Sequence, residues 1–205
     1  DSDLTRALDE RAIPYIMINP AHEHTRNAVV FDEHDNVRLA FTALLDAGHR
    51  RIGYLDYSKA REPHRTVSMR RNAYLNACRS HRIAPHFFSE DFADITSVRT
   101  AADLRPLPTG VIAYSLDLAQ KFFSRIYRNR RVNPQHFSII SAAEDVYQDR
   151  TPLKITGVAL PVAAMADAAV EKLLHRIIHK NENVATVQLS GVLVVRETLH
   201  PRPRK

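Results

Sequence analysis

Several polar side chains follow apolar segments of strand length, where they are placed to bind a small polar molecule. Carboxylates, amides and hydroxyls supply hydrogen-bond donors and acceptors. Because the chain has no Trp, any aromatic ring that stacks against such a molecule must come from Tyr or Phe. The strand-end candidates are Asn19, Tyr57, Tyr114, Ser115, Glu144 and Asp145. Each also has a structural interpretation, as a strand-end cap, a core-lining ring or a solvated loop residue, and the residue types alone leave both open.

Motifs of the commonest α/β enzymes are missing. The chain has only five glycines, whereas loops that bind phosphate need several close together. Gly48 and Gly53 have the outer spacing of a P-loop, but Tyr54 and Leu55 stand where Lys and Ser or Thr are required. No Gly-x-Gly pair and no Gly-x-Ser-x-Gly segment occurs. The pattern therefore argues against the commonest α/β enzymes, and we expect neither an enzymatic activity nor a cofactor.

Histidines form two patterns that resemble metal sites. His22 and His24 lie near an acidic run, but such ligands converge only if the loop folds back. His175 and His179 are spaced as in zinc proteases, yet Arg176 replaces the glutamate that this chemistry requires. Basic residues in the last turn of a helix already interact favourably with the helix dipole. We therefore predict no metal site.

Composition sets the class of protein. The 205 residues are 44% apolar and 25% charged, which is typical of one globular unit or two small lobes rather than a disordered chain. The single cysteine, Cys78, excludes an intramolecular disulfide and favours a reducing cytosol. No apolar run approaches the roughly 18 residues that cross a bilayer, and residues 1–10 lack the pattern of a secretory signal. The net charge of +6 is spread along the chain, which favours solvated basic faces over direct binding to nucleic acid.

Apolar periodicity predicts strands and helices that alternate along the chain. Strands are expected at 12–19, 28–31, 51–56, 110–114, 137–140 and 155–159, followed by one or two strands within 184–195. Helices are expected at 3–11, 35–47, 67–81, 95–104, 116–128 and 161–179. This alternation is typical of parallel sheets covered by helices, which bind ligands outside the carboxyl ends of their strands. The candidate residues lie at such ends.

Four segments resemble the effector-binding, periplasmic-binding-protein-like domain of LacI/GalR-type bacterial transcription repressors. Residues 12–19 (AIPYIMIN) are similar to the family's strand that ends in a polar sugar-contacting residue, and 46–53 (DAGHRRIG) to its GHRRI element. Residues 161–174 (PVAAMADAAVEKLL) resemble its penultimate helix, and 194–198 (VVRET) its terminal VVRES strand. The four occur in family order across the chain. At 141–145 the chain departs from the family, because SAAED replaces Gly-Phe-Asp-Asp.

The resemblance implies an α/β fold of two doubly wound parallel-sheet lobes joined by crossing strands, the type I periplasmic-binding-protein-like arrangement, with the ligand between the lobes. On this basis residues 1–31 and 161–189 form the N-terminal lobe. Residues 32–160 and 190–205 form the C-terminal lobe. The opening elements of the N-terminal lobe are expected to precede Asp1, so that this lobe is incomplete.

The resemblance also implies roles for single residues. Arg70 lies four residues before Tyr74, the spacing at which the family places an arginine that contacts the effector; the alternative is a solvated helix residue. Asn19 stands where the family often has Asp, and Ser115 lies near the position of its Asn-Asp pair. Glu144 follows the fifth strand, where a contact with a ligand hydroxyl and solvation of the loop are equal alternatives.

The function that the resemblance implies is the ligand-sensing core of a DNA-binding transcription regulator. It would bind a small polar effector, a sugar or a derivative, and perform no chemistry. The expected partners are the effector, a second copy in a homodimer, and operator DNA, contacted through a helix-turn-helix headpiece before Asp1. The expected location is the bacterial cytoplasm, without contact to a membrane. The alternative is a periplasmic solute-binding protein for a sugar, although the GHRR and VVRE segments favour the repressor branch.

Overall fold

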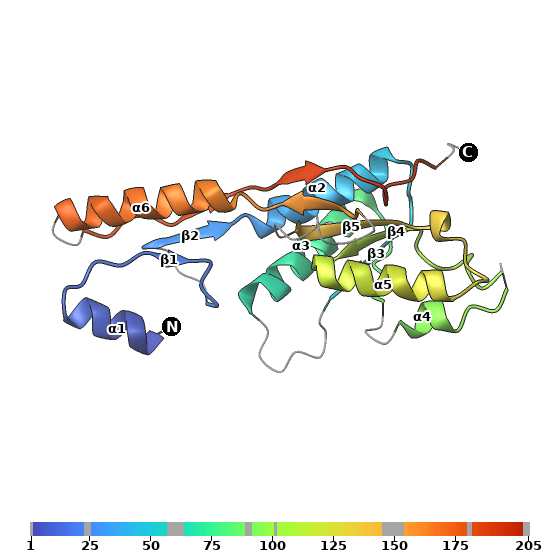
Figure 1. The fold of residues 1–205 in the computed structure, drawn as a ribbon, viewed down its shortest axis with the longest axis horizontal. Helices are drawn as coiled ribbons and strands as arrows, with labels where there is room; N and C mark the ends of the chain where they lie inside the picture. Colours follow the sequence, from blue (N-terminus) through green and yellow to red (C-terminus); the bar gives the residue numbers. More distant parts are fainter. Residues whose placement is uncertain are drawn as a thin grey trace.

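The computed structural model describes residues 2–22, 26–56, 64–88, 92–100, 102–144, 154–179 and 182–202. Its elements form two parts that follow one another along the long axis of the molecule (Figure 1). The smaller part contains α1 (Ser2–Glu10), β1 (Met17–Ile18), β2 (Ala28–Phe31), α6 (Val162–Ile178) and β7 (Val187–Leu189). The larger part contains α2 (Glu33–Asp46), β3 (Ile52–Leu55), α3 (Arg65–His81), α4 (Ala93–Thr96), β4 (Gly110–Ala113), α5 (Leu116–Arg128), η1 (Pro134–His136), β5 (Ser138–Glu144), β6 (Thr156–Ala159) and β8 (Val192–Val194).

Each part is built on its own sheet. In the smaller part the strand order is β1-β2-β7, and all three strands are parallel. In the larger part the order is β3-β4-β5-β6-β8, and β8 alone runs antiparallel, beside β6. Strands β3 to β5 are buried along almost their whole length, because helices cover both faces of the sheet.

Three short connections carry the chain between the two sheets. Strand β2 leads into α2, β6 leads into α6, and β7 leads into β8. The third connection is fixed to α2, because the Asn36 amide oxygen accepts a hydrogen bond of 2.9 Å from the Gly191 backbone nitrogen. The chain therefore enters, leaves and re-enters the larger part through one narrow region (Figure 1).

Local signals in the sequence explain where the helices begin and end. Asp32 caps α2 by accepting a hydrogen bond from the Asp35 backbone nitrogen at 2.9 Å, and Ser115 caps α5 in the same way through the Leu118 nitrogen. After α2, Gly48 adopts a φ of +92°, which side chains disfavour. A Cβ there would also lie 2.9 Å from the Arg202 carbonyl oxygen, so the turn requires glycine.

The core of the larger part lies on both faces of its sheet. On one face α2 and α3 bury a cluster that contains Phe41, Leu44 and Tyr74. On the other face α5 buries Phe122 and Ile126, together with further apolar residues of β4 and β5. Each fully buried side chain of this size stabilises the fold by about 1.5–3 kcal/mol. The cluster of the smaller part is more modest, with Val29, Met165 and Ala169 buried between α6 and the sheet.

Most predicted elements are present, and two are wrong in extent. The expected strand at 12–19 is only Met17–Ile18, because Ala12 and Ile13 donate backbone hydrogen bonds back to α1 and the pairing with β2 begins at Met17. The expected helix at 95–104 stops at Thr96, where the Asp103 carboxylate instead accepts two hydrogen bonds from backbone nitrogens at 99 and 100. At 184–195, where one or two strands are expected, the chain forms two, β7 and β8, and they belong to different sheets. No helix among the described residues is long and apolar enough to cross a membrane.

Candidate functional site

The carboxyl ends of the parallel strands in both sheets face the region of the three connections. This follows from the topology, since the chain leaves the carboxyl ends of β2, β6 and β7 to enter the other part. The two parts also touch there, because the Arg65 backbone nitrogen, at the start of α3, donates a hydrogen bond of 3.1 Å to the Ala21 carbonyl oxygen. Ligands of parallel sheets bind at such an edge.

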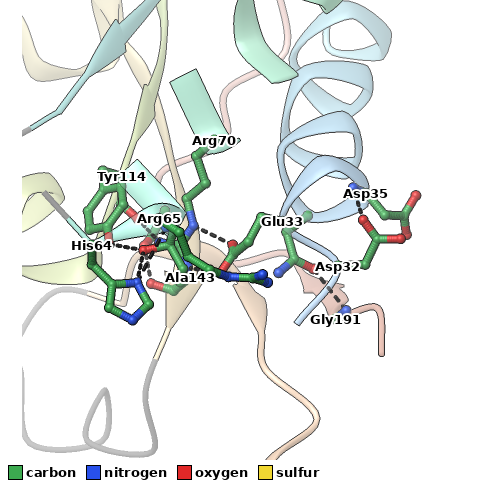
Figure 2. A network of polar contacts seen from close by, with 12 residues as sticks. Asp32, Glu33, Asp35, His64, Arg65, Arg70, Tyr114, Ala143 and Gly191 are labelled. Atoms are coloured by element: carbon green, nitrogen blue, oxygen red, sulfur yellow. Dashed lines mark hydrogen bonds and ion pairs between the residues drawn. The ribbon is translucent and has the colours of Figure 1, made fainter. Parts of the chain in front are cut away.

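Arg70, the predicted effector-contacting arginine, forms a buried ion pair with Glu33 (Figure 2). Its Nε and Nη2 atoms donate to the two carboxylate oxygens at 2.5 and 3.0 Å, and Nη1 donates to the Tyr114 carbonyl oxygen at 2.6 Å. Glu33 is 0% exposed and Arg70 is 5% exposed. Burial lowers the pKa of Arg70, but the hydrogen bonds and charge of Glu33 outweigh this and raise it overall. Arg70 is therefore held charged by α2.

Tyr114 and Ser115 follow β4, and both make contacts that position the site. The Arg70 guanidinium lies 4.4 Å from the centre of the Tyr114 ring. The Tyr114 hydroxyl and Thr66 Oγ1 share a hydrogen bond of 2.7 Å. Ser115 uses its hydroxyl oxygen to cap α5. Both residues remain half-buried rather than buried, so part of each side chain is accessible at the edge of the sheet.

Glu144 lies at the end of β5, as predicted, but its carboxylate binds Arg196. The Arg196 Nη1 and Nη2 atoms donate to its two oxygens at 2.5 and 2.7 Å. Nη1 also donates to the Ile155 carbonyl oxygen at 3.0 Å. Glu144 is 8% exposed. The pair therefore joins the end of β5 to the segment after β8 and orders this edge of the sheet.

Asn19 and Arg65 differ from these paired residues, because each carries polar atoms without a partner. Asn19 follows β1 with a left-handed φ of 44°, a conformation that Asn tolerates. Among the described residues, its Oδ1 atom and the Nε and Nη2 atoms of Arg65 are buried and form no hydrogen bond. Such unsatisfied groups are rare in folded proteins. They offer an acceptor from the smaller part and two donors from the larger part.

The remaining candidates, Tyr57 and Asp145, lie outside the described residues. Three residues that the sequence interpretation passed over contribute to the site, namely Glu33, Arg65 and Arg196. Arg196 belongs to the VVRET segment that carries the family resemblance. Glu33 and Arg65 stand in the first turns of α2 and α3, and their position at the carboxyl edge of the sheet was the available signal.

A family model described as the periplasmic binding protein-like domain matches residues 41–199. The chain belongs to this family. The ribose operon repressor of Haemophilus influenzae is 29% identical over 168 residues, which cover 79% of this chain and 50% of that protein. A LacI family transcriptional regulator from Enterococcus faecium, solved with bound ribose, superposes with a TM-score of 0.75 at 21% identity, covering 98% of this chain and 75% of that one. Another, from Weissella paramesenteroides with bound sucrose, gives a TM-score of 0.77 at 18% identity, with coverages of 98% and 74%.

These similarities confirm the resemblance to LacI/GalR-type regulators and the predicted α/β fold of parallel-sheet lobes. The curated relatives are named as a repressor and as transcriptional regulators. The chain spans between 50% and 59% of the length of these relatives. The family's periplasmic-binding-protein-like fold thus accounts for the arrangement of the two sheets around a shared edge.

Proposed function

We propose that this chain is the sugar-sensing part of a LacI-type transcription regulator and that it performs no chemistry. The ligand would bind between the two sheets, at the edge where their parallel strands end. Support comes from the relatives, one of which is named for the ribose operon, and from similar structures solved with ribose or sucrose. The observation that carries the proposal is the pair of unsatisfied side chains, Asn19 and Arg65, on opposite sides of this edge.

In this proposal the two lobes are discontinuous in sequence. Residues 1–31 and 161–189 belong to the N-terminal lobe, and 32–160 and 190–205 to the C-terminal lobe. Asn19 would accept a hydrogen bond from a sugar hydroxyl, and Arg65 would donate to a sugar oxygen. A ligand can shift the angle between lobes only if it binds one arrangement more tightly than the other. Contacts from both lobes to one ligand provide that difference.

The paired residues take a supporting role in this proposal. Arg70, held by Glu33, presents its guanidinium behind the Tyr114 ring and so fixes the ring as a platform on which a sugar face can pack. Ser115 and the residues outside the described ranges, Tyr57 and Asp145, complete the predicted contact set. Glu144 orders the edge through Arg196 rather than binding the ligand directly.

A change in the angle between the lobes on ligand binding would reach the DNA through the dimer. We propose a homodimer in the bacterial cytoplasm whose two headpieces bind operator DNA, since half-site spacing in such DNA follows the symmetry of the protein. The competing function is that of a periplasmic solute-binding protein for a sugar. Sequencing the coding region upstream of Asp1 separates the two. A helix-turn-helix supports the regulator, and a secretory signal refutes it.

The test of ligand binding is thermal unfolding of the purified chain with ribose, sucrose and a panel of other sugars. A ligand present at 100 times its Kd adds about 2.7 kcal/mol of stability, which raises Tm by roughly 5–10 °C in a protein of this size. We expect at least one sugar to give such a rise. We also expect Asn19→Ala and Arg65→Ala to abolish it.

Arg79→Ala is the matched control, because Arg79 is an exposed residue of the same helix as Arg65. This variant should respond to the sugar like the unmodified protein. If no sugar in a broad panel raises Tm, the proposed function is refuted. If a sugar stabilises both Asn19→Ala and Arg65→Ala as strongly as the unmodified chain, the sensing function stands but the site is elsewhere.

A further inference from the structure

Three ligand-type side chains gather at the carboxyl end of α6, far from the proposed sugar site. His175 and His179 belong to the last turn and a half of the helix region, and Glu182 follows it. One ligand atom from each lies within 4.8 Å of the other two. The two imidazole rings are 4.2 Å apart, centre to centre. All three side chains are exposed.

The position of the two histidines follows from helix geometry, because residues four apart project from the same face. The position of Glu182 follows from tertiary contacts. Arg176, which is 1% exposed, donates from Nε to the Glu182 carbonyl oxygen at 3.3 Å and from Nη1 to the Tyr15 carbonyl oxygen at 2.6 Å. The Glu182 backbone nitrogen donates to the His179 carbonyl oxygen at 3.2 Å. A buried side chain thus holds the backbone of Glu182 against the end of α6.

The chain beyond Glu182 is fixed as well. The Asn27 backbone nitrogen donates to the Val184 carbonyl oxygen at 2.7 Å, and the Val184 nitrogen donates back to the Asn27 side-chain oxygen at 3.0 Å. The Asn27 amide nitrogen also donates to Asn183 at 2.7 Å. Glu182 therefore stands on a short segment whose backbone is anchored on both sides, so only its side chain needs to be ordered when its carboxylate binds beside the histidines.

We propose that His175, His179 and Glu182 form a binding site for Zn²⁺. Two imidazole nitrogens and one carboxylate oxygen are ligands that zinc prefers, and the fourth tetrahedral position would be left to water. Ligands bound at about 2.0–2.2 Å from a tetrahedral ion lie roughly 3.3 Å from one another. The side chains must approach by about 1.5 Å from their largest present separation, which exposed side chains on fixed backbones achieve by small rotations about their bonds.

This site differs from the one that the spacing of the histidines first suggested. Arg176 replaces the glutamate of the protease pattern, and it serves instead as the buried anchor that positions the third ligand. Helix-dipole stabilisation accounts for two basic side chains at the end of a helix, but not for a carboxylate held beside them. Bound zinc would join the end of α6 to the segment that leads into β7.

In the experiment, ZnCl₂ is titrated into the metal-free chain, which is purified without a histidine tag, and isothermal titration calorimetry measures the heat of binding. We expect one Zn²⁺ per chain. Loss of a hydrogen-bond partner of a metal ligand alone weakens binding by about 10–100-fold, so His175→Ala and His179→Ala should each weaken it by at least about tenfold. Glu182→Gln should also weaken it. In a parallel titration, Co²⁺ should give the visible absorption of a tetrahedral site in the unmodified chain and not in the two histidine variants.

His34→Ala is the matched control, because His34 is an exposed histidine on α2 outside the cluster. It should bind zinc as the unmodified chain does. The proposal is overturned if the unmodified chain binds no Zn²⁺, if both histidine variants bind it undiminished, or if His34→Ala weakens binding as much as they do. Circular dichroism of each variant shows whether a loss of binding reflects a loss of folding. If the histidine variants do not fold, Glu182→Gln, a surface change of similar size and shape, replaces them. Weaker Zn²⁺ binding by this variant then supports the proposal, and undiminished binding overturns it.

Discussion

Replacement of Arg70 by alanine should destabilise the protein strongly, because it leaves the Glu33 carboxylate buried without its partner. Glu33 is 0% exposed, and Arg70 supplies two hydrogen bonds to it, of 2.5 and 3.0 Å. Breaking such a pair from one side costs about 3–5 kcal/mol, which is a large part of the roughly 5–15 kcal/mol that holds a domain folded. In a chain of this size the loss corresponds to a decrease in Tm of roughly 6–20 °C.

Urea unfolding followed by circular dichroism measures the free energy of unfolding directly. The double variant Glu33→Leu with Arg70→Met removes both charges, and it should recover most of the loss, since apolar side chains can replace a buried ion pair. Lys121→Ala is the control: it breaks an ion pair with Asp117 in which both side chains are 57% exposed, and it should cost no more than about 0.5 kcal/mol. If Arg70→Ala costs less than about 1 kcal/mol and yet abolishes the response to sugar, the reasoning is refuted, and Arg70 contacts the effector as the family spacing predicts.

Three further predictions concern stability. The His49 ring is 1% exposed, and burial, with the nearby charge of Arg202, lowers its pKa from 6.5 to about 4. The unfolded chain binds this proton more readily, so the contribution of His49 is complete above pH 6.5 and declines by about 3 kcal/mol as the pH falls to 4. As the pH is lowered from 6.5 to 4, the urea midpoint should therefore decrease more steeply in the unmodified protein than in His49→Gln. Parallel plots of midpoint against pH for the two proteins would contradict this. Gly48→Ala should cost more than about 1 kcal/mol by thermal unfolding, because its φ is +92° and a Cβ would meet Arg202; an unchanged Tm would show that the turn adapts. Glu144→Gln should lower the free energy of unfolding by about 1–3 kcal/mol, because it weakens the ion pair with Arg196. A change below about 0.5 kcal/mol in urea unfolding would show that this pair does not stabilise the edge of the sheet.

The sequence predicts long, strongly periodic elements well. The expected helix at 35–47 is α2 and the expected helix at 161–179 is α6, each within two residues at either end. These helices carry a continuous apolar face and clear terminal signals. The helix expected at 95–104 fails because its polar residues bond locally, with Asp103 closing a loop. Local hydrogen bonds of this kind compete with helix formation and leave no mark on apolar periodicity.

The sequence predicts where the candidate site lies, but not which side chains form ion pairs there. Strand order places Asn19, Tyr114 and Glu144 at carboxyl ends of strands, as expected. The partners that occupy Arg70 and Glu144 come from 37 and 52 residues away in the chain. No spacing rule covers such distances, because they depend on how helices pack on the sheet. Arg65 was missed for the related reason that an unsatisfied donor is recognised only when all its neighbours are known.

Tertiary contacts also explain why the sequence alone does not predict the cluster of side chains at the end of α6. The spacing of the two histidines is visible in the sequence, but Glu182 lies beside them through tertiary contacts, which include the hydrogen bond from Arg176 to its carbonyl oxygen. The residue spacing therefore indicates two potential metal ligands, whereas three such side chains lie together in the folded protein.

The path of the chain through its two sheets limits how the protein can fold during synthesis. The smaller sheet lacks its third strand until residues 187–189 have been made, and the larger one lacks its edge strand until residues 192–194 follow. Neither sheet is built from one continuous stretch of chain, so neither can be completed before these later strands have left the ribosome. The early strands would wait with unpaired edges, which are prone to wrong pairing. Translation speed between β2 and these later strands, and chaperones that shield strand edges, should therefore affect the yield of this protein.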